Sequence, residues 1–158
     1  MSVTINTKIN GKSVSASAEA YTSLLEFLRD TLEYKGTKLC CNTGECGACT
    51  IIFNGKPINS CVTLAADADG ANITTVEGLA DDDKLHPVQQ AFIDTGAVQC
   101  GYCTPGFIIS VKALLDRTQK PTPEDIEEAV SGNICRCTGY NKIVDAIHLA
   151  ADKMAGRV

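Results

Sequence analysis

Alternation of apolar and polar residues predicts that the first half of the chain is rich in strands. The segment VTINTKINGKSVSAS alternates around Asn10-Gly11, and TIIFNGKPIN alternates around Asn54-Gly55. Asn-Gly is favoured in two-residue hairpin turns, because both of its residues adopt positive φ with little strain. The pattern therefore predicts two β-hairpins.

A helical period lies between the two hairpins. In the segment SLLEFLRDTL, Ser23 is followed three residues later by Glu26, which is the spacing of a capping box. One helical face of this segment carries Leu24, Leu25, Leu28 and Leu32. The first half is thus predicted to be a small sheet that carries one helix.

The second half is predicted to be helical. Three prolines stand where a first helical turn would begin, in the pairs His86-Pro87, Thr104-Pro105 and Thr122-Pro123. Proline is favoured in the first turn of a helix, and threonine is a good N-cap. In the fourth segment, NKIVDAIHLAADKMA, one stripe carries Ile143, Ile147, Ala150 and Met154. Four short helices predict a compact bundle.

The segment EGLADDDKLHP has the composition of an exposed connector between the halves. Its acidic run, Asp81, Asp82 and Asp83, is interpreted as solvated. We therefore expect an α+β protein with one domain at 1–78 and a second at 79–158. Two domains of about 75 residues each would be marginal on hydrophobic burial alone, so additional cross-links are expected.

Composition and charge restrict the function. The 158 residues carry a formal net charge of -5 and no Lys/Arg cluster, which argues against nucleic acid or an anionic membrane as partner. The first residues lack the apolar core of a signal peptide, and no apolar run is long enough to span a membrane. We expect a cytoplasmic protein, whose nine cysteines are better explained by metal than by disulfides.

The first cysteine group has the C-x4-C-x2-C spacing of plant-type [2Fe-2S] ferredoxins, with a distant fourth cysteine. Its candidate ligands are Cys41, Cys46, Cys49 and Cys61. Gly44 and Gly47 would let the loop adopt positive φ and approach an anionic cluster closely. A zinc site or unliganded thiols are the alternatives. Cys40 breaks the spacing and is interpreted as a small buried hydrophobic residue, with a ligand-swap or redox role as the alternative.

The second group consists of a C-x2-C pair and a C-x-C pair, namely Cys100, Cys103, Cys135 and Cys137. Each pair leads into a predicted helix start, at Thr104-Pro105 and near Asn141, so two positive helix ends would point at an anionic centre. A second [2Fe-2S] cluster fits this arrangement. Zinc is a stronger rival here, because paired cysteines are typical of its sites. A redox dithiol at CGYC is a further alternative, but the surrounding βαβ pattern is absent.

Three segments resemble a known family. The segments are GTKLCCNTGECGACTIIFNGKPINSC, VQCGYCTPGFI and GNICRCTGYNKIVDAI. In order and spacing they closely resemble the small iron-sulfur subunit of molybdenum hydroxylases. This group includes xanthine dehydrogenase, aldehyde oxidoreductase and molybdenum-type carbon monoxide dehydrogenase. The resemblance covers essentially the whole chain and favours iron-sulfur clusters over zinc in the second group.

The resemblance implies a plant-type ferredoxin β-grasp domain followed by a four-helix domain. The flavin-side cluster would be held by Cys41, Cys46, Cys49 and Cys61. The molybdenum-side cluster would be held by Cys100, Cys103, Cys135 and Cys137. Gln99 and Cys137 would approach the pterin of the molybdenum cofactor. Cys40 departs from the family pattern, which commonly has glycine at that position.

The sequence indicates an electron-transfer subunit with no catalytic residues of its own. His86 and His148 are both interpreted as solvent-facing. The resemblance implies a large molybdopterin-binding partner and a medium FAD-binding partner, in a heterotrimer or its dimer. A free-standing two-cluster ferredoxin and a zinc-binding interaction module are the alternatives. Because large apolar residues are scarce, we also expect the iron-free protein to be largely unfolded.

Overall fold

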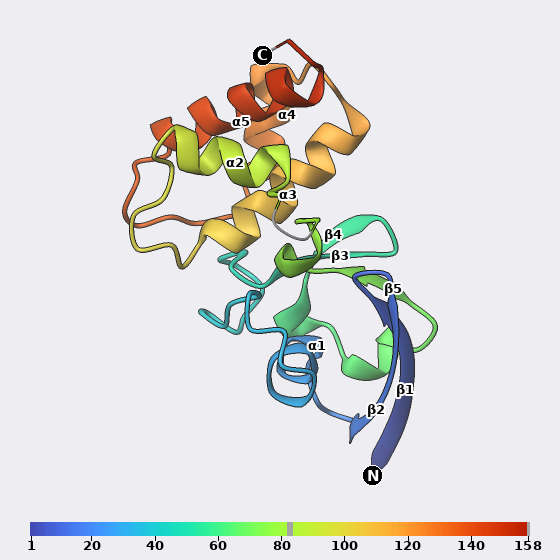
Figure 1. Cartoon of the computed structure of the whole chain (residues 1–158). Coiled ribbons are helices and arrows are strands. Elements are labelled where there is room, and N and C mark those ends of the chain that lie inside the picture. Colours follow the sequence, from blue (N-terminus) through green and yellow to red (C-terminus); the bar gives the residue numbers. More distant parts are fainter. Residues whose placement is uncertain (82–83, 158) are drawn as a thin grey trace.

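The structure is a computed structural model that describes residues 1–81 and 84–157. A mixed sheet fills one end of the molecule and four helices are gathered at the other (Figure 1). The strands are β1 (Ser2–Ile9), β2 (Lys12–Glu19), β3 (Thr50–Phe53), β4 (Lys56–Asn59) and β5 (Asn72–Thr74). Their order in the sheet is β2-β1-β5-β3-β4. The α+β composition predicted from the sequence is confirmed.

Both predicted hairpins are present. Strand β1 pairs antiparallel with β2, and β3 pairs antiparallel with β4. The turn residues Asn10, Gly11, Asn54 and Gly55 all have positive φ, as a tight two-residue turn requires.

The sequence pattern missed β5, which joins the two hairpins. It pairs parallel with β1 and antiparallel with β3. Only three residues long, β5 is too short to produce a recognisable alternation, although Ile73 at its centre is fully buried. This strand converts two separate hairpins into one sheet.

The helix predicted after the first hairpin begins as expected but changes its winding. Ser23 and Glu26 form the capping box, and α1 extends over Leu24–Glu26. The chain then continues as a π-helix, Phe27–Thr31, in which the Leu32 N–H donates to the Phe27 carbonyl at 3.1 Å. The hydrophobic pattern could not distinguish this wider turn from an α-helical one.

Helices form where the prolines and the apolar stripe predicted them. They are α2 (Pro87–Asp94), α3 (Thr104–Arg117), α4 (Pro123–Val130) and α5 (Asn141–Met154). Thr122 caps α4 through its side chain, as expected. At α3 the predicted cap was wrong, because Thr104 is already helical and Cys103 occupies the cap position. The helix therefore begins directly at a candidate metal ligand.

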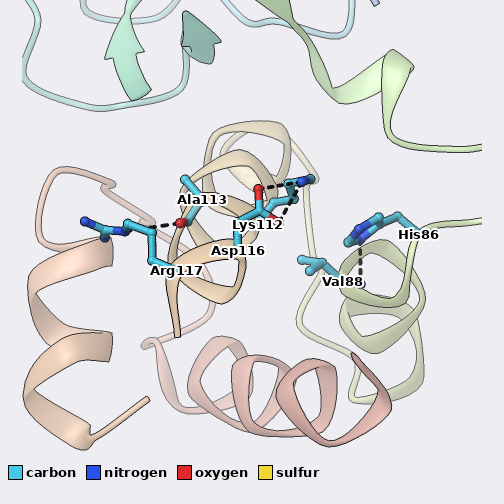
Figure 2. A network of polar contacts seen from close by, with 6 residues as sticks. All are labelled: His86, Val88, Lys112, Ala113, Asp116 and Arg117. Carbon is cyan, nitrogen blue, oxygen red and sulfur yellow. Dashed lines mark hydrogen bonds and ion pairs between the residues drawn. The ribbon is translucent and has the colours of Figure 1, made fainter. Parts of the chain in front are cut away.

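The prediction that His86 simply faces solvent was wrong. Its side chain is half-buried, and its Nδ1 accepts a hydrogen bond from the Val88 N–H at 3.2 Å, which caps α2 (Figure 2). Burial, and then the nearby ammonium of Lys112, lower the pKa of His86, whereas Asp116 opposes the shift. His148 is exposed, as predicted.

The helices enclose the larger hydrophobic core, to which the sheet also contributes. Phe92, Phe107 and Ile143 are fully buried there, and Ile52 of β3 belongs to the same core. Figure 1 shows α3 beside β3 and β4. A smaller core lies between the sheet and α1. The two halves are therefore packed against each other through α3 and β3.

Parts of the predicted connector can be placed. Asp81 is exposed and forms an isolated bridge with Lys84, whereas Asp82 and Asp83 of the acidic run lie outside the described residues. Within residues 1–81 and 84–157, no helix has the length and apolar character needed to cross a membrane.

Candidate metal centres

Hydrogen-bond donors surround the sulfur of Cys41 and favour its thiolate form. The backbone N–H groups of Thr43 and Cys46 each lie 3.4 Å from its Sγ. The hydroxyl of Thr43, followed by these two N–H groups, lowers the pKa of Cys41 to about 5. Because the thiolate is the form that binds metal, the loop prepares Cys41 as a ligand.

Cys49 and Cys61 lie together beside Leu25 in a small buried cluster. Burial, and then contact with Cys49, raise the pKa of Cys61 to about 11. Two adjacent thiols in an apolar setting resist ionisation unless a positive charge lies between them. A bound metal supplies that charge and deprotonates its thiol ligands, so this pair fits a metal site.

Two glycines shape the loop around these sulfurs. Gly44 has φ +81°, and a Cβ there would lie 3.3 Å from the side chain of Val62. Gly47 has φ +68°, and a Cβ there would lie 2.3 Å from the Gly132 carbonyl oxygen. The positive φ expected at both glycines is present, and at Gly47 the close neighbour is the loop of the second cysteine group.

The interpretation of Cys40 as a buried residue was wrong. Cys40 is exposed, and contact with the Cys46 thiol is the main reason that its pKa is raised. The residue belongs to an irregular surface loop, so no core is available to bury it. Cys40 therefore stands beside a candidate ligand without the N–H donors that surround Cys41.

The second cysteine group is assembled as two facing pairs. The Sγ atoms of Cys100 and Cys137 lie 3.6 Å apart. Burial, and then contact with Cys135, raise the pKa of Cys103 to about 12. The C-x2-C and C-x-C pairs thus face each other, with one cysteine of each motif in each contact.

Cys135 is stabilised as a thiolate in the way that Cys41 is. Although burial raises its pKa, the Thr138 hydroxyl at 3.1 Å and the Thr138 N–H at 3.4 Å lower it to about 7. The N–H of Cys135 donates to the hydroxyl of Tyr140 at 3.1 Å. Tyr140 has φ +68° and leads directly into α5, so the N-terminus of this helix adjoins the second group.

The two groups share a cavity of about 140 Å³. It is lined by Cys40, Cys46, Ala48, Cys100, Tyr102, Cys103, Ile134, Cys135, Arg136 and Cys137. The N–H of Ile134 donates to the carbonyl of Cys46 at 2.9 Å, and the hydroxyl of Tyr102 donates to the carbonyl of Leu39. Sequence reasoning missed Ile134 and Tyr102, because no spacing motif reports contacts between two loops this far apart in the chain.

One edge of the second group is open. Cys100, Cys137 and the predicted pterin-contacting residue Gln99 are all exposed. Large apolar side chains are exposed at neighbouring positions in the same two loops, namely Val98, Tyr102, Ile134 and Tyr140. This edge therefore combines accessible thiols with an apolar surround.

All nine cysteines are free thiols. Within residues 1–81 and 84–157, no three or more His, Cys, Asp or Glu side chains are arranged around a single metal ion. The thiols instead contact one another in pairs: Cys49 with Cys61, Cys103 with Cys135, Cys100 with Cys137, and the non-candidate Cys40 with Cys46. A [2Fe-2S] cluster takes four thiolates over two irons, so paired sulfurs suit its chemistry.

Two family models match the chain. Residues 7–80 match a 2Fe-2S iron-sulfur cluster binding domain, and residues 75–148 match a [2Fe-2S] binding domain. The two matches together span both cysteine groups.

Named relatives align over nearly the whole chain. The small FeS subunit of nicotinate dehydrogenase from Eubacterium barkeri is 50% identical, covering 97% of this chain and 98% of the relative. The structure of quinoline 2-oxidoreductase from Pseudomonas putida 86 matches with a TM-score of 0.92 and 40% identity over 99% of both chains. Aldehyde oxidoreductase from Desulfovibrio desulfuricans matches with a TM-score of 0.94 and 42% identity, over 98% of this chain and 17% of that one.

Proposed function

The chain belongs to the family of small iron-sulfur subunits of molybdenum hydroxylases, and on that basis we propose that it relays single electrons between a molybdopterin centre and FAD on partner subunits. The role as an electron-transfer subunit of an oxidoreductase follows from the family. The two clusters, their individual ligands and the identity of the partners are the further content of the proposal.

Eight cysteines would hold two [2Fe-2S] clusters, which supply one-electron redox chemistry when bound. The first set is Cys41, Cys46, Cys49 and Cys61, in a β-grasp domain at 1–78. The second set is Cys100, Cys103, Cys135 and Cys137, in a four-helix domain at 79–158. The N–H groups directed at Cys41 and Cys135 favour their thiolate forms, which supports this assignment.

The observation that carries the proposal is the hydrogen bond from the Ile134 N–H to the Cys46 carbonyl, 2.9 Å long. It joins a candidate ligand of the first set to the residue that precedes Cys135 of the second set. In any fold this bond satisfies two backbone polar groups. For an electron relay, the connection brings the two sets of ligands close together through the protein.

The exposed edge of the second set supports contact with a molybdenum-binding partner. Gln99 and Cys137 are the residues proposed to approach the pterin there, and the apolar side chains around them suit burial in an interface. Next to the first set of cysteines, Val62 and Leu64 are exposed just after Cys61. These apolar side chains suit contact with the flavin-binding partner. The 17% coverage of the Desulfovibrio desulfuricans chain supports function within a larger assembly.

We further propose a heterotrimer, or its dimer, located in the cytoplasm. The cytoplasmic assignment rests on the cysteine chemistry, because a reducing compartment keeps thiols available for metal.

The test is purification of the assembled complex through a tag on this chain, followed by metal, sulfide and flavin analysis. The proposal expects about four iron and four acid-labile sulfide per chain, together with molybdenum and FAD on two larger polypeptides. A monodisperse chain that carries iron and sulfide but retains no partner would indicate a free-standing ferredoxin instead. Zinc without sulfide would reject the proposal.

A further inference from the structure

Asn133 is a buried polar residue whose side-chain amide is bonded at both ends. Only 5% of the residue is exposed. Its Nδ2 donates to the carbonyl of Gly47 at 3.0 Å, and its Oδ1 accepts from the hydroxyl of Ser110 at 2.7 Å. A buried amide with both partners in place is a rigid connection, because loss of either partner leaves a polar group unsatisfied.

The atoms that Asn133 joins belong to segments that carry candidate ligands. Gly47 directly follows Cys46, Ser110 lies in α3 beyond Cys103, and Asn133 itself stands two residues before Cys135. The link to Gly47 spans 86 positions in the sequence. One side chain therefore bonds the first cysteine loop, helix α3 and the second cysteine loop together.

The backbones at this junction are in direct contact. A Cβ on Gly106 would lie 2.1 Å from the Gly47 carbonyl oxygen, and a Cβ on Gly47 would lie 2.4 Å from Nδ2 of Asn133. The Gly47 carbonyl also accepts from the Thr50 hydroxyl at 2.7 Å. With no side-chain space at the junction, a group at position 133 that no longer bonds to the Gly47 carbonyl is accommodated only by a shift of one loop relative to the other.

We infer that Asn133 is the positioning residue that fixes the separation and relative orientation of the two cluster-binding loops. This inference rests on the proposed function, because the spacing of the loops matters only if electrons pass between them. Transfer between two redox centres slows steeply as they move apart, so a rigid spacer at this junction would keep transfer fast.

The test uses N133D in the assembled, iron-loaded complex. Aspartate keeps the shape of asparagine but directs a carboxylate oxygen, rather than an N–H donor, at the Gly47 carbonyl. Iron and sulfide should remain at the wild-type content. The splitting of the electron paramagnetic resonance signals by interaction between the two reduced clusters should change, because this interaction depends on their separation and orientation. Amide exchange at Ile134 should accelerate by about tenfold or more.

A matched control is N54D, which makes the same chemical change in the exposed turn between β3 and β4. The side-chain oxygen of Asn54 accepts from the Asn72 N–H, and aspartate can still accept that bond. The control should match wild type in both measurements.

The inference would be overturned if N133D showed the same splitting of the paramagnetic resonance signals and the same amide exchange rate at Ile134 as wild type. If N133D does not assemble, the same two measurements are made on S110A, which removes only the donor to Asn133 Oδ1. In S110A, a smaller change in the splitting and in the exchange at Ile134 would support the inference, and wild-type values would reject it. Failure of the proposed function is distinguishable, because the wild-type complex would then lack the signals of two clusters.

Discussion

The sulfur atoms of Cys100 and Cys137 lie 3.6 Å apart, although 37 positions separate the two residues in the sequence. Both residues are exposed, and contact with Cys100 is the main reason that the pKa of Cys137 is raised. An exposed pair of thiols brought together from two loops is ready to share one metal centre. The same contact places the predicted ligands at the edge where a partner can reach them.

Replacement of Cys137 by alanine should remove one cluster and leave the other. Its side chain contributes to the second set alone, so C137A should retain about half of the iron and sulfide of wild type. The measurement is metal and sulfide analysis of the purified chain, with the visible spectrum as a check that one cluster remains. Full wild-type iron content in C137A would remove this residue from the proposed ligands.

Cys40 and Cys41 should respond in opposite ways to substitution. C41A should lose about half of the iron, because hydrogen bonds hold the Cys41 thiol as a thiolate. C40A should keep the full content, since Cys40 has no such donors and is exposed. Iron analysis of the two variants side by side checks this pair of outcomes. The reverse pattern would identify Cys40 as the ligand.

The sequence predicted the parts of the fold that depend on local spacing. Asn-Gly turns and helix-starting prolines are short-range signals, and each was found where the pattern predicted it. The ligand set of the C-x4-C-x2-C loop stays a prediction. The exposure of Cys40 and the capping role of His86 were missed, because each depends on surroundings made by other segments. Spacing alone reports neither burial nor hydrogen-bond partners.

Contacts between the two loops could not be predicted for a similar reason. The bonds from Asn133 to Gly47 and from Ile134 to Cys46 connect residues that are more than eighty positions apart. They exist because α3 packs on β3 and brings both loops to one junction. No periodicity or motif in the sequence encodes that packing.

Stability should depend on the protonation of His86. Burial lowers its pKa, so the folded protein favours the neutral ring, whose Nδ1 accepts from the Val88 N–H. The stabilisation is present above the unfolded pKa of about 6.5 and is lost as the pH falls through the lower folded value. The urea concentration at the unfolding midpoint should therefore decrease as the pH is lowered from 8 to 5. This decrease should be larger than the one in a variant that lacks His86.

Asparagine at position 86 provides that variant. It is a good N-cap but does not titrate in this range, so H86N should keep the cap and lose this part of the pH dependence. Alanine cannot cap the helix, so H86A should lower the free energy of unfolding by about 1 kcal/mol at pH 8. An identical pH profile in wild type and H86N would show that His86 does not link protonation to stability.

Removal of iron should unfold much of the chain. The cysteine loops have no regular secondary structure, and the candidate ligands come together only in the folded chain, so metal binding contributes directly to folding. Far-ultraviolet circular dichroism of the chelated protein should lose most of the native signal and regain it when iron and sulfide are restored. A complete native spectrum without iron would contradict this expectation.

Alanine at Gly106 should destabilise the protein although it lies in a helix. Alanine normally stabilises a helix interior by about 1 kcal/mol relative to glycine. Here the new Cβ would lie 2.1 Å from the Gly47 carbonyl oxygen, so α3 or the first cysteine loop must shift. Overpacking of this kind costs about 1–3 kcal/mol, and urea unfolding of G106A should show a loss in that range.

Gly132 is the matched control for this substitution. Nothing lies within 4 Å of a Cβ built there, and its φ is not positive. G132A should therefore change the free energy of unfolding by no more than about 0.5 kcal/mol. Equal stability of G106A, G132A and wild type would mean that the close approach of α3 to the first cysteine loop does not constrain the fold. A loss confined to G106A would locate the constraint at the junction of the two cysteine loops.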